Sequence, residues 1–316
     1  MSAHLRPRAQ TVFGRPDGPV RAVCEVVGRR PEGAYVSLTV AAPQIAERAL
    51  PGQFVNVAVE CRGALLRRPF SIYRTSRQGP WVGTVEFILD PHGPGTAWLA
   101  ERAPHEVLDV VGPLGNVFPV PAQRVPCLLV GGGYGAAPLF FLAERLRAEG
   151  QRVAMLLGAA TGERIFNAIE AKRTSANVTF TTDDGSYGIR GRVTDALPDV
   201  ARDGGTGVVY ACGPMPMLRE VARVCGELRL PCQVAVEEHM ACATGVCWTC
   251  VVPLRGKDGR VRMKRSCVDG PVFNGARVAW DESRWVPAPV DEEFLPNVGA
   301  PAPQVATARS AEEDRR

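Results

Sequence analysis

Residues 127–135 read CLLVGGGYG, a short apolar run that ends in a series of glycines. A buried strand followed directly by a helix explains this pattern, because apolar residues continue beyond Gly135. Glycines at such a junction let the chain turn tightly and let a phosphate approach the amides at the start of the helix. Although the spacing is not a strict G-x-G-x-x-G, it predicts a nucleotide-binding turn at Gly131, Gly132 and Gly133.

Downstream of this turn, strands and helices alternate. Apolar runs typical of strands lie at residues 153–157, 178–182, 208–211 and 233–236. Helical stretches are expected to begin near Ala136, Glu163, Val193 and Pro216. This alternation predicts a parallel sheet with crossover helices, an α/β nucleotide-binding domain over residues 123–236.

Upstream of the turn, short apolar segments separated by Gly or Pro follow one another. They lie at residues 20–28, 34–40, 53–60, 69–74, 84–90 and 106–111. Closely spaced short strands predict a small antiparallel β-barrel, here assigned to residues 15–122. One helix is expected among them, with Thr96 as its N-cap and a course through Ala100.

Length and composition limit the possible classes of protein. A chain of 316 residues has room for two or three domains, and its formal net charge of +4 comes with no dense basic block. Neither nucleic acid nor a membrane surface is indicated as a partner. Residues 1–14 lack the apolar core of a signal peptide, and the most apolar stretch, residues 125–143, is interrupted by glycines and Pro138. We therefore expect a cytoplasmic protein with mostly reduced thiols.

Four of the ten cysteines lie close together near the C-terminus. Cys242, Cys247 and Cys250 have the C-x4-C-x2-C spacing of plant-type [2Fe-2S] proteins, and Cys267 follows as a fourth ligand. Gly245 allows the loop to turn tightly around inorganic sulfide. A zinc site with four thiolates is the main alternative, but zinc ribbons usually have two C-x2-C pairs and only one is present. The sequence thus predicts a [2Fe-2S] segment over residues 237–284.

Trp248 lies between two of these cysteines, and two interpretations stay open. Its ring could line an electron exit towards a partner, or it could be a packing residue that shields the cluster from water. Beyond Trp285 the chain is rich in Pro, Ala and charge, so residues 285–316 are expected to form a mobile tail.

A short motif in the barrel region indicates a flavin. The stretch Arg68-Pro69-Phe70-Ser71 resembles the Arg-x-Tyr-Ser/Thr motif of the ferredoxin-NADP reductase superfamily. A guanidinium can neutralise pyrophosphate, an aromatic face can stack on the flavin, and the Ser71 hydroxyl can bond near the reactive N5 atom. Gly95 and Thr96, in the turn before the predicted helix, are candidates for the FAD phosphates, although an ordinary capped turn is the interpretation that this turn alone would favour.

Two further strand ends are candidates for the nicotinamide nucleotide. Cys212, Gly213 and Pro214 follow the fourth strand of the α/β domain at the edge where ligands bind. Cys212 is a candidate catalytic residue beside the nicotinamide, with a buried structural thiol as the alternative. Asp183 and Asp184 end the third strand, where carboxylates would repel a 2′-phosphate, so NAD is favoured over NADP.

The order of barrel, α/β domain and cysteine segment resembles the electron-transfer subunits of NAD-dependent dihydroorotate dehydrogenases. The resemblance covers roughly residues 20–280 and rests on the motifs above together with GPLGN (112–116), TDDGSYG (182–188) and CVDGPVF (267–273). It implies an α+β and α/β multidomain oxidoreductase that holds FAD and a [2Fe-2S] cluster, with Ile88, Leu89 and Asp90 also in the FAD site. It further implies a hetero-oligomer, expected to be a heterotetramer, with an FMN-containing catalytic subunit, and electron exchange with NAD(H).

Two departures from the family pattern affect these expectations. Ala243 replaces the glycine that usually follows the first cysteine, so it must adopt an α- or β-region backbone or be strained. Asp90 stands where an arginine often precedes the phosphate-binding turn, which removes one positive contact to FAD.

Two other functions remain as alternatives. The same three modules would serve a reductase subunit for a hydrogenase, sulfite reductase or oxygenase. A non-enzymatic regulator whose cysteines bind zinc or sense oxidation is the second.

Overall fold

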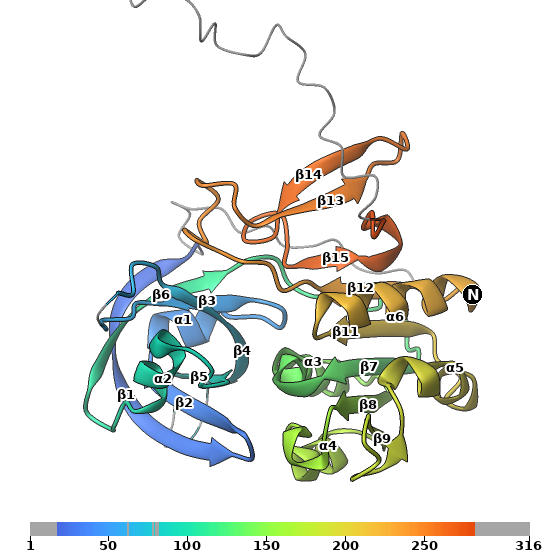
Figure 1. Ribbon diagram of the computed structural model, residues 1–316, viewed down its shortest axis with the longest axis horizontal. Coiled ribbons are helices and arrows are strands. Elements are labelled where there is room, and N and C mark those ends of the chain that lie inside the picture. Colours follow the sequence, from blue (N-terminus) through green and yellow to red (C-terminus); the bar gives the residue numbers. More distant parts are fainter. Residues whose placement is uncertain (1–17, 62, 78, 80–81, 282–316) are drawn as a thin grey trace, which may run out of the picture. The chain divides into compact units, whose positions relative to one another are not determined.

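In the computed structural model, six antiparallel strands of the N-terminal part close into a barrel, in the order β1-β2-β5-β4-β3-β6 (Figure 1). The structure describes residues 18–281 except 62, 78 and 80–81. The strands are β1 (Val20–Glu32), β2 (Tyr35–Ala41), β3 (Phe54–Val57), β4 (Arg68–Ser76), β5 (Thr84–Leu89) and β6 (Val107–Leu114). The antiparallel barrel predicted from the spacing of short apolar segments is therefore confirmed.

Alternation of side chains along these strands fills the barrel interior. Val26 and Val110 are among its fully buried residues, while their chain neighbours are more exposed. One helix, α1 (Pro43–Arg48), was not expected from the sequence.

The second barrel helix, α2 (Pro94–Ala100), begins earlier than predicted. Gly93 is its N-cap, whereas Thr96 lies in the first turn and its hydroxyl bonds back to the amide of Gly93 at 3.1 Å. The prediction of Thr96 as N-cap is wrong because Pro94, with its fixed φ, takes the first helical position.

The part of the chain that follows the barrel contains a seven-stranded sheet, with the strand order β10-β9-β8-β7-β11-β12-β15. All neighbours are parallel except β15, which runs antiparallel to β12. The strands are β7 (Cys127–Gly132), β8 (Val153–Ala159), β9 (Asn177–Thr182), β10 (Ile189–Arg190), β11 (Val208–Cys212), β12 (Cys232–Ala235) and β15 (Val272–Asn274). The five predicted parallel strands are confirmed, and β10 and β15 are additional.

Helices cover both faces of this sheet. The core on one face contains residues of α3 (Ala137–Ala148) and α4 (Ala168–Thr174), and the core on the other contains residues of α5 (Val193–Asp203) and α6 (Met215–Glu227). The helix expected to begin near Glu163 is instead a short 3-10 turn, Gly162–Arg164, and α4 starts only at Ala168. Ile165 and Phe166 turn into the core and Asn167 is left-handed, with φ 47°, which delays the helix.

The cysteine-rich segment adds the hairpin of β13 (Val251–Arg255) and β14 (Val261–Arg265), and its β15 joins the large sheet. The described residues up to Trp280 belong to one compact unit. The predicted domain boundaries stay predictions, and the tail expected at 285–316 lies outside the described residues. None of the described helices has the length and apolar character that crossing a membrane requires.

Candidate functional site

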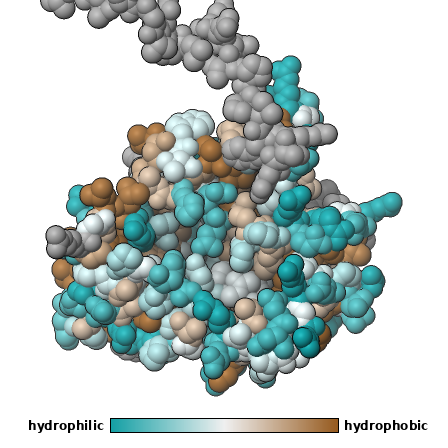
Figure 2. Space-filling view, in the orientation of Figure 1, coloured by the Kyte–Doolittle hydropathy of each residue, from teal (hydrophilic) through white to brown (hydrophobic). Residues whose placement is uncertain are grey.

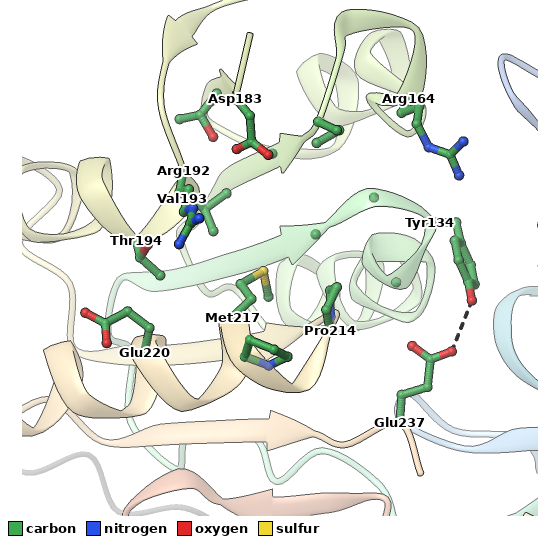
Figure 3. A pocket seen from close by; sticks show the side chains of 18 of the residues that line it. Tyr134, Arg164, Asp183, Arg192, Val193, Thr194, Pro214, Met217, Glu220 and Glu237 are labelled. Carbon is green, nitrogen blue, oxygen red and sulfur yellow. Dashed lines mark hydrogen bonds between the residues drawn. The ribbon is translucent and has the colours of Figure 1, made fainter. Parts of the chain in front are cut away.

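A cavity of about 580 Å³ lies at the carboxyl ends of the parallel strands (Figure 3). Its lining includes the predicted residues Gly132, Gly133, Asp183 and Pro214. The carboxyl edge of an open parallel sheet is where such folds bind nucleotides. Three separate sequence motifs therefore converge on one cavity.

The glycine turn allows close backbone approaches beside this cavity. A Cβ on Gly131 would lie 2.6 Å from the Cβ of Ala136, and one on Gly135 would lie 2.8 Å from the Cα of Gly213. Real Cβ atoms do not approach this closely, so side chains here would force the β7 turn and the Gly213 turn apart. Gly131 thus has a packing role, whereas Gly132 and Gly133 line the cavity.

Cys212 ends β11 but is not among the residues that line the cavity. Its side chain is buried, and burial raises the pKa of the thiol above its usual value, with the carboxylate of Glu237 adding to the effect. The thiol is therefore protonated at neutral pH. Its neighbour Gly213, with φ 155°, brings Pro214 to the cavity wall. A catalytic role of Cys212 stays a prediction.

Tyr134 and Glu237 are among the cavity residues that were not foreseen as site residues. Tyr134 donates a hydrogen bond from its hydroxyl to Glu237 at 3.1 Å, at the end of the cavity that faces away from Asp183 (Figure 3). Burial raises the pKa of the Tyr134 hydroxyl, and the neighbouring carboxylate raises it further. Glu237 follows β12 just as Cys212 ends β11, so the rule that ligands bind at strand ends could have identified it.

The two predicted flavin motifs meet in the barrel. A Cβ built on Gly95 would lie 3.3 Å from Nε of Arg68, so the guanidinium lies against the turn that opens α2. This juxtaposition places a cation beside backbone amides, a combination that suits a pyrophosphate. Ser71 is exposed on β4, and Pro69 is partly exposed beside it. The arrangement fits FAD, although the individual contacts stay predictions.

Other residues assigned to the FAD site are buried or make hydrogen bonds within the chain. Phe70 is only 9% exposed and stacks on Phe87 with ring centroids 5.1 Å apart, so most of its ring belongs to the barrel core. Leu89 is fully buried, which leaves only its backbone for a ligand, and Ile88 packs in the core of the nucleotide-binding sheet. Thr96 uses its hydroxyl to cap α2.

Asp90 has a partner that the sequence did not reveal. Nη2 of Arg164, from the segment after β8, lies 2.6 Å from Oδ2 of Asp90. The same guanidinium lies over the ring of Tyr35, whose hydroxyl donates to the carbonyl of Arg164. Positive charge is thus supplied next to Asp90 by the nucleotide-binding domain.

The thiols of the four predicted cluster ligands interact with one another: Cys242 interacts with Cys247, and Cys267 interacts with both Cys250 and Cys242. Cys242 and Cys247 are called the outer pair here, and the buried Cys250 and Cys267 the inner pair. Cys250 and Cys267 are buried, whereas Cys247 is exposed. Within the described part of the chain, no three His, Cys, Asp or Glu side chains converge as a single metal ion requires.

Two backbone hydrogen bonds favour the ligand form of Cys242. The amides of Thr244 and Cys247 both donate to Sγ of Cys242 at 3.4 Å. Partial burial opposes ionisation, but the bonds from Cys247 and Thr244 outweigh it and lower the pKa of the Cys242 thiol to about 6. A thiolate, the form that binds iron, is therefore favoured at neutral pH.

The loop that carries these ligands is bent in unusual backbone conformations. Ala243 is buried with φ 58°, so of the alternatives predicted for this residue the strained one is present. Gly245 has φ 87°, and its carbonyl accepts a 2.7 Å hydrogen bond from Arg265. The guanidinium of Arg265 also lies 4.6 Å from the ring centre of Trp248, which is 54% exposed. Arg265 thereby fastens the loop to the end of β14.

The cysteine segment packs directly on the barrel. Phe54 and Leu114 share a buried cluster with Ala243, Cys250 and Cys267. Nδ2 of Asn56 donates to the carbonyl of Cys242 at 3.4 Å, and Nδ2 of Asn116 donates to that of Asp269 at 2.8 Å. The inner pair of cysteines therefore faces the barrel.

Comparisons with known proteins agree with this geometry. Residues 237–279 match the family described as the iron-sulfur cluster binding domain of dihydroorotate dehydrogenase B, and residues 129–223 match the oxidoreductase NAD-binding domain. A dihydroorotate dehydrogenase B (NAD(+)) electron transfer subunit from Desulforamulus reducens is 36% identical, over 76% of this chain and 90% of its own length. The corresponding subunit from Geobacillus kaustophilus is 39% identical over 76% and 91%. A solved structure of NADH-dependent reduced ferredoxin-NADP oxidoreductase matches with a TM-score of 0.72 and 31% identity, over 83% of this chain and 91% of that one.

A closed barrel beside a parallel nucleotide-binding sheet, with a paired four-cysteine segment, defines an iron-sulfur flavoprotein reductase with the ferredoxin-NADP reductase fold. The chain belongs to the family of dihydroorotate dehydrogenase B (NAD(+)) electron transfer subunits. FAD, a [2Fe-2S] cluster and NAD are its cofactors, and it is an oxidoreductase subunit. The predicted family and cofactors are confirmed, whereas the assignment of individual residues to each cofactor stays a prediction.

Proposed function

We propose that this chain passes electrons between NAD(H) and an FMN-containing catalytic subunit that oxidises dihydroorotate, a step of pyrimidine biosynthesis. The complex is a cytoplasmic heterotetramer in this proposal. The relatives' names supply the reaction, and one structural observation supports the route. Phe54 on β3 is paired with Ser71 on β4 and packs in the same buried cluster as Cys250 and Cys267. A single residue thus connects the predicted flavin strand with the inner pair of cluster ligands.

Each part of the chain has a separate task in this function. Bound FAD supplies the conversion between two-electron exchange with NAD(H) and one-electron exchange with the cluster. Arg68 and the α2 turn bind phosphate groups, and Ser71 presents a hydroxyl from the exposed side of β4. The glycine turn and Pro214 hold the nicotinamide nucleotide in the cavity. No residue of this chain needs to act as acid or base on dihydroorotate.

The catalytic subunit is proposed to dock over the outer pair of ligands. Val246 and Trp248, on either side of Cys247, are 78% and 54% exposed. Figure 2 shows apolar residues on the upper part of this face, where Figure 1 places the cysteine segment. Exposed apolar side chains beside a redox centre suit a partner that must approach closely. Of the two interpretations of Trp248, its exposure favours a place at the exit rather than a purely internal packing role.

Anaerobic purification followed by titration with NADH tests the proposal. We expect two irons, two acid-labile sulfides and one FAD per chain, bleaching of the flavin absorbance, and the EPR signal of a reduced [2Fe-2S] cluster. Adding the catalytic subunit and dihydroorotate should then give NAD-dependent turnover. Flavin reduction without a cluster signal would contradict the proposed route.

A reductase subunit for a different redox partner is the second candidate. The similarity to NADH-dependent reduced ferredoxin-NADP oxidoreductase favours it, since this match covers more of the chain than the dihydroorotate dehydrogenase relatives do. Complex formation with a dihydroorotate-oxidising subunit distinguishes the two candidate functions. A chain that reduces its cluster with NADH, but forms no complex with a dihydroorotate-oxidising subunit, would serve another partner.

A further inference from the structure

We infer that the hydroxyl of Ser266 donates a hydrogen bond to a sulfur of the bound cluster beside the inner pair, Cys250 and Cys267, and thereby raises the reduction potential of the cluster. Ser266 directly precedes Cys267 in the chain and is fully buried. Its Oγ has no hydrogen-bond partner within the described part of the chain. The inference rests on the predicted cluster ligands of the proposed function and adds a residue that tunes the cluster they hold.

A fully buried hydroxyl without a partner is unusual in a folded protein. Buried polar side-chain atoms are nearly always hydrogen-bonded, because otherwise the bonds that they made to water in the unfolded chain are not replaced. Ser37 is buried to the same degree, and its hydroxyl donates to the carboxylate of Glu86. Ser266 has a proton to donate and no acceptor, so a group that binds beside it is expected to supply one.

The pairing of β13 with β14 places Ser266 opposite Cys250. Val251 pairs with Arg265 across the hairpin, and the amide of Ser266 donates to the carbonyl of Cys250 at 2.7 Å, which continues the pairing by one residue. Residues that lie directly opposite each other in an antiparallel pair point to the same face, with Cβ atoms about 4.5–5.5 Å apart. The side chain of Ser266 therefore lies on the face from which Cys250 presents its thiol.

The turn after β14 brings the second inner ligand to the same place. The amide of Asp269 donates to the carbonyl of Arg265 at 2.8 Å, so the chain folds back directly after the strand. Cys267 lies within this turn, is buried, and its thiol interacts with that of Cys250. Ser266 thus has one inner ligand opposite it and the other next to it along the chain.

A hydroxyl at this position would act on the charge of the cluster. Sγ of Cys242 in the outer pair accepts two backbone hydrogen bonds, from Thr244 and Cys247, whereas no backbone amide of the described residues donates to Sγ of Cys250. The sulfurs become more negative when the cluster accepts an electron, so a donor stabilises the reduced form more than the oxidised form. Burial strengthens this effect, because little water is present to screen it. A donor beside the inner pair therefore raises the reduction potential.

Redox titration of the full-length, cofactor-loaded chain with dithionite and mediators, followed by the EPR signal of the reduced cluster, tests the inference. Ser266→Ala should lower the equilibrium constant for cluster reduction about tenfold, which for one electron is a shift of about 59 mV to a more negative potential. Ser266→Gly also lacks the donor and should shift in the same direction, so the comparison does not depend on one variant retaining its cluster. Ser266→Thr keeps the hydroxyl and should stay close to the wild type.

Val252→Ala is the matched control for packing. Val252 is fully buried and pairs with Lys264 on the same face of the hairpin, but its side chain has no hydrogen-bond donor. Its truncation should lower the free energy of unfolding and leave the potential unchanged. Equal shifts in Val252→Ala and Ser266→Ala would overturn the inference, because looser packing would then explain both.

Electron-nuclear double resonance of the dithionite-reduced cluster in H2O and D2O detects the donor itself. The wild type should show an exchangeable proton coupling that Ser266→Ala and Ser266→Gly lack. An unchanged spectrum or an unchanged potential in these variants would overturn the inference and indicate that the hydroxyl bonds a buried water instead. A wild-type cluster that dithionite reduces but NADH does not would contradict the proposed electron route, while the potentials of the Ser266 variants would still decide the inference.

Discussion

At the scale of single residues, Ala243 shows how the cluster loop tolerates a substitution that its backbone disfavours. Its φ of 58° lies in the left-handed region, which costs an L-residue about 1–2 kcal/mol, and its methyl group is buried beside Phe54 and Leu114. Burial of that methyl group offsets part of the strain. The loop therefore accepts alanine, but a larger side chain would have neither the backbone freedom nor the space.

We predict that Ala243→Val will prevent stable cluster assembly. A β-branched residue is a pronounced outlier at positive φ, and two additional methyl groups would overpack a buried site at a cost of about 1–3 kcal/mol. Iron and acid-labile sulfide per chain, measured after anaerobic purification, should fall well below two each. Ala243→Gly is the control and should load fully, so equal loading of both variants would show that the loop is not constrained at this position.

Asp90 allows a second prediction about a single charge. Its carboxylate is 2.6 Å from Arg164 and lies three residues before Gly93, the N-cap of the turn that is predicted to bind FAD phosphate. Removing it in Asp90→Ala leaves the Arg164 cation free near that turn and removes a repulsive charge. We expect FAD to bind about fivefold more tightly, equivalent to roughly 1 kcal/mol for a partly exposed charge.

Quenching of flavin fluorescence during titration of the FAD-free protein measures this change. Asp90→Glu retains the charge and should bind FAD like the wild type. Weaker FAD binding by Asp90→Ala would mean that the Asp90–Arg164 pair organises the site rather than opposing the phosphate.

At the scale of elements, β15 joins the cysteine segment to the nucleotide-binding sheet, so the segment is not an independent unit. Val272 and Phe273 are buried, and β15 pairs with β12 of the nucleotide-binding sheet. Cys250 and Cys267 are buried partly by Phe54 and Leu114 of the barrel. We therefore predict that residues 237–281 expressed alone will not hold a stable cluster, because both sets of contacts would be lost.

Reconstitution with iron and sulfide under anaerobic conditions tests this prediction. The isolated fragment should lose its visible absorbance within the time for which the full chain keeps it. A fragment that retains the cluster as well as the full chain would show that the segment folds on its own.

The elements also show what the sequence could and could not predict. Local patterns were sufficient for the barrel strands, the glycine turn and the cysteine spacing, because each depends on neighbours along the chain. The Tyr134–Glu237 bond and the Asp90–Arg164 pair depend on tertiary packing between distant segments. Phe70 was assigned to the flavin by its place in a motif, whereas cross-strand packing on Phe87 turns most of its ring into the barrel.

At the scale of the whole molecule, the barrel and the nucleotide-binding sheet share a hydrophobic core. Tyr35, Tyr73 and Ile88 come from the barrel strands but pack in the same buried cluster as Phe140 and Phe166. Such a shared core limits relative movement of the two cofactor sites, since sliding would expose aromatic rings to water. A fixed arrangement suits hydride transfer, which needs the reacting groups held close together.

Tyr73 provides the test of this shared core. Its ring makes edge contacts with Phe140 at 5.7 Å and Phe166 at 5.5 Å, and its hydroxyl accepts a 2.9 Å hydrogen bond from Asn167. We predict that Tyr73→Ala lowers the free energy of unfolding by about 3–5 kcal/mol, because it leaves a cavity between the two domains. Tyr73→Phe keeps the ring but leaves the Asn167 amide unpaired, so it should cost only about 1–3 kcal/mol. In urea unfolding followed by flavin release and by far-UV circular dichroism, the wild type should show coincident transitions. Tyr73→Ala should separate them, and coincident transitions in that variant would mean that contacts other than this aromatic cluster couple the two domains.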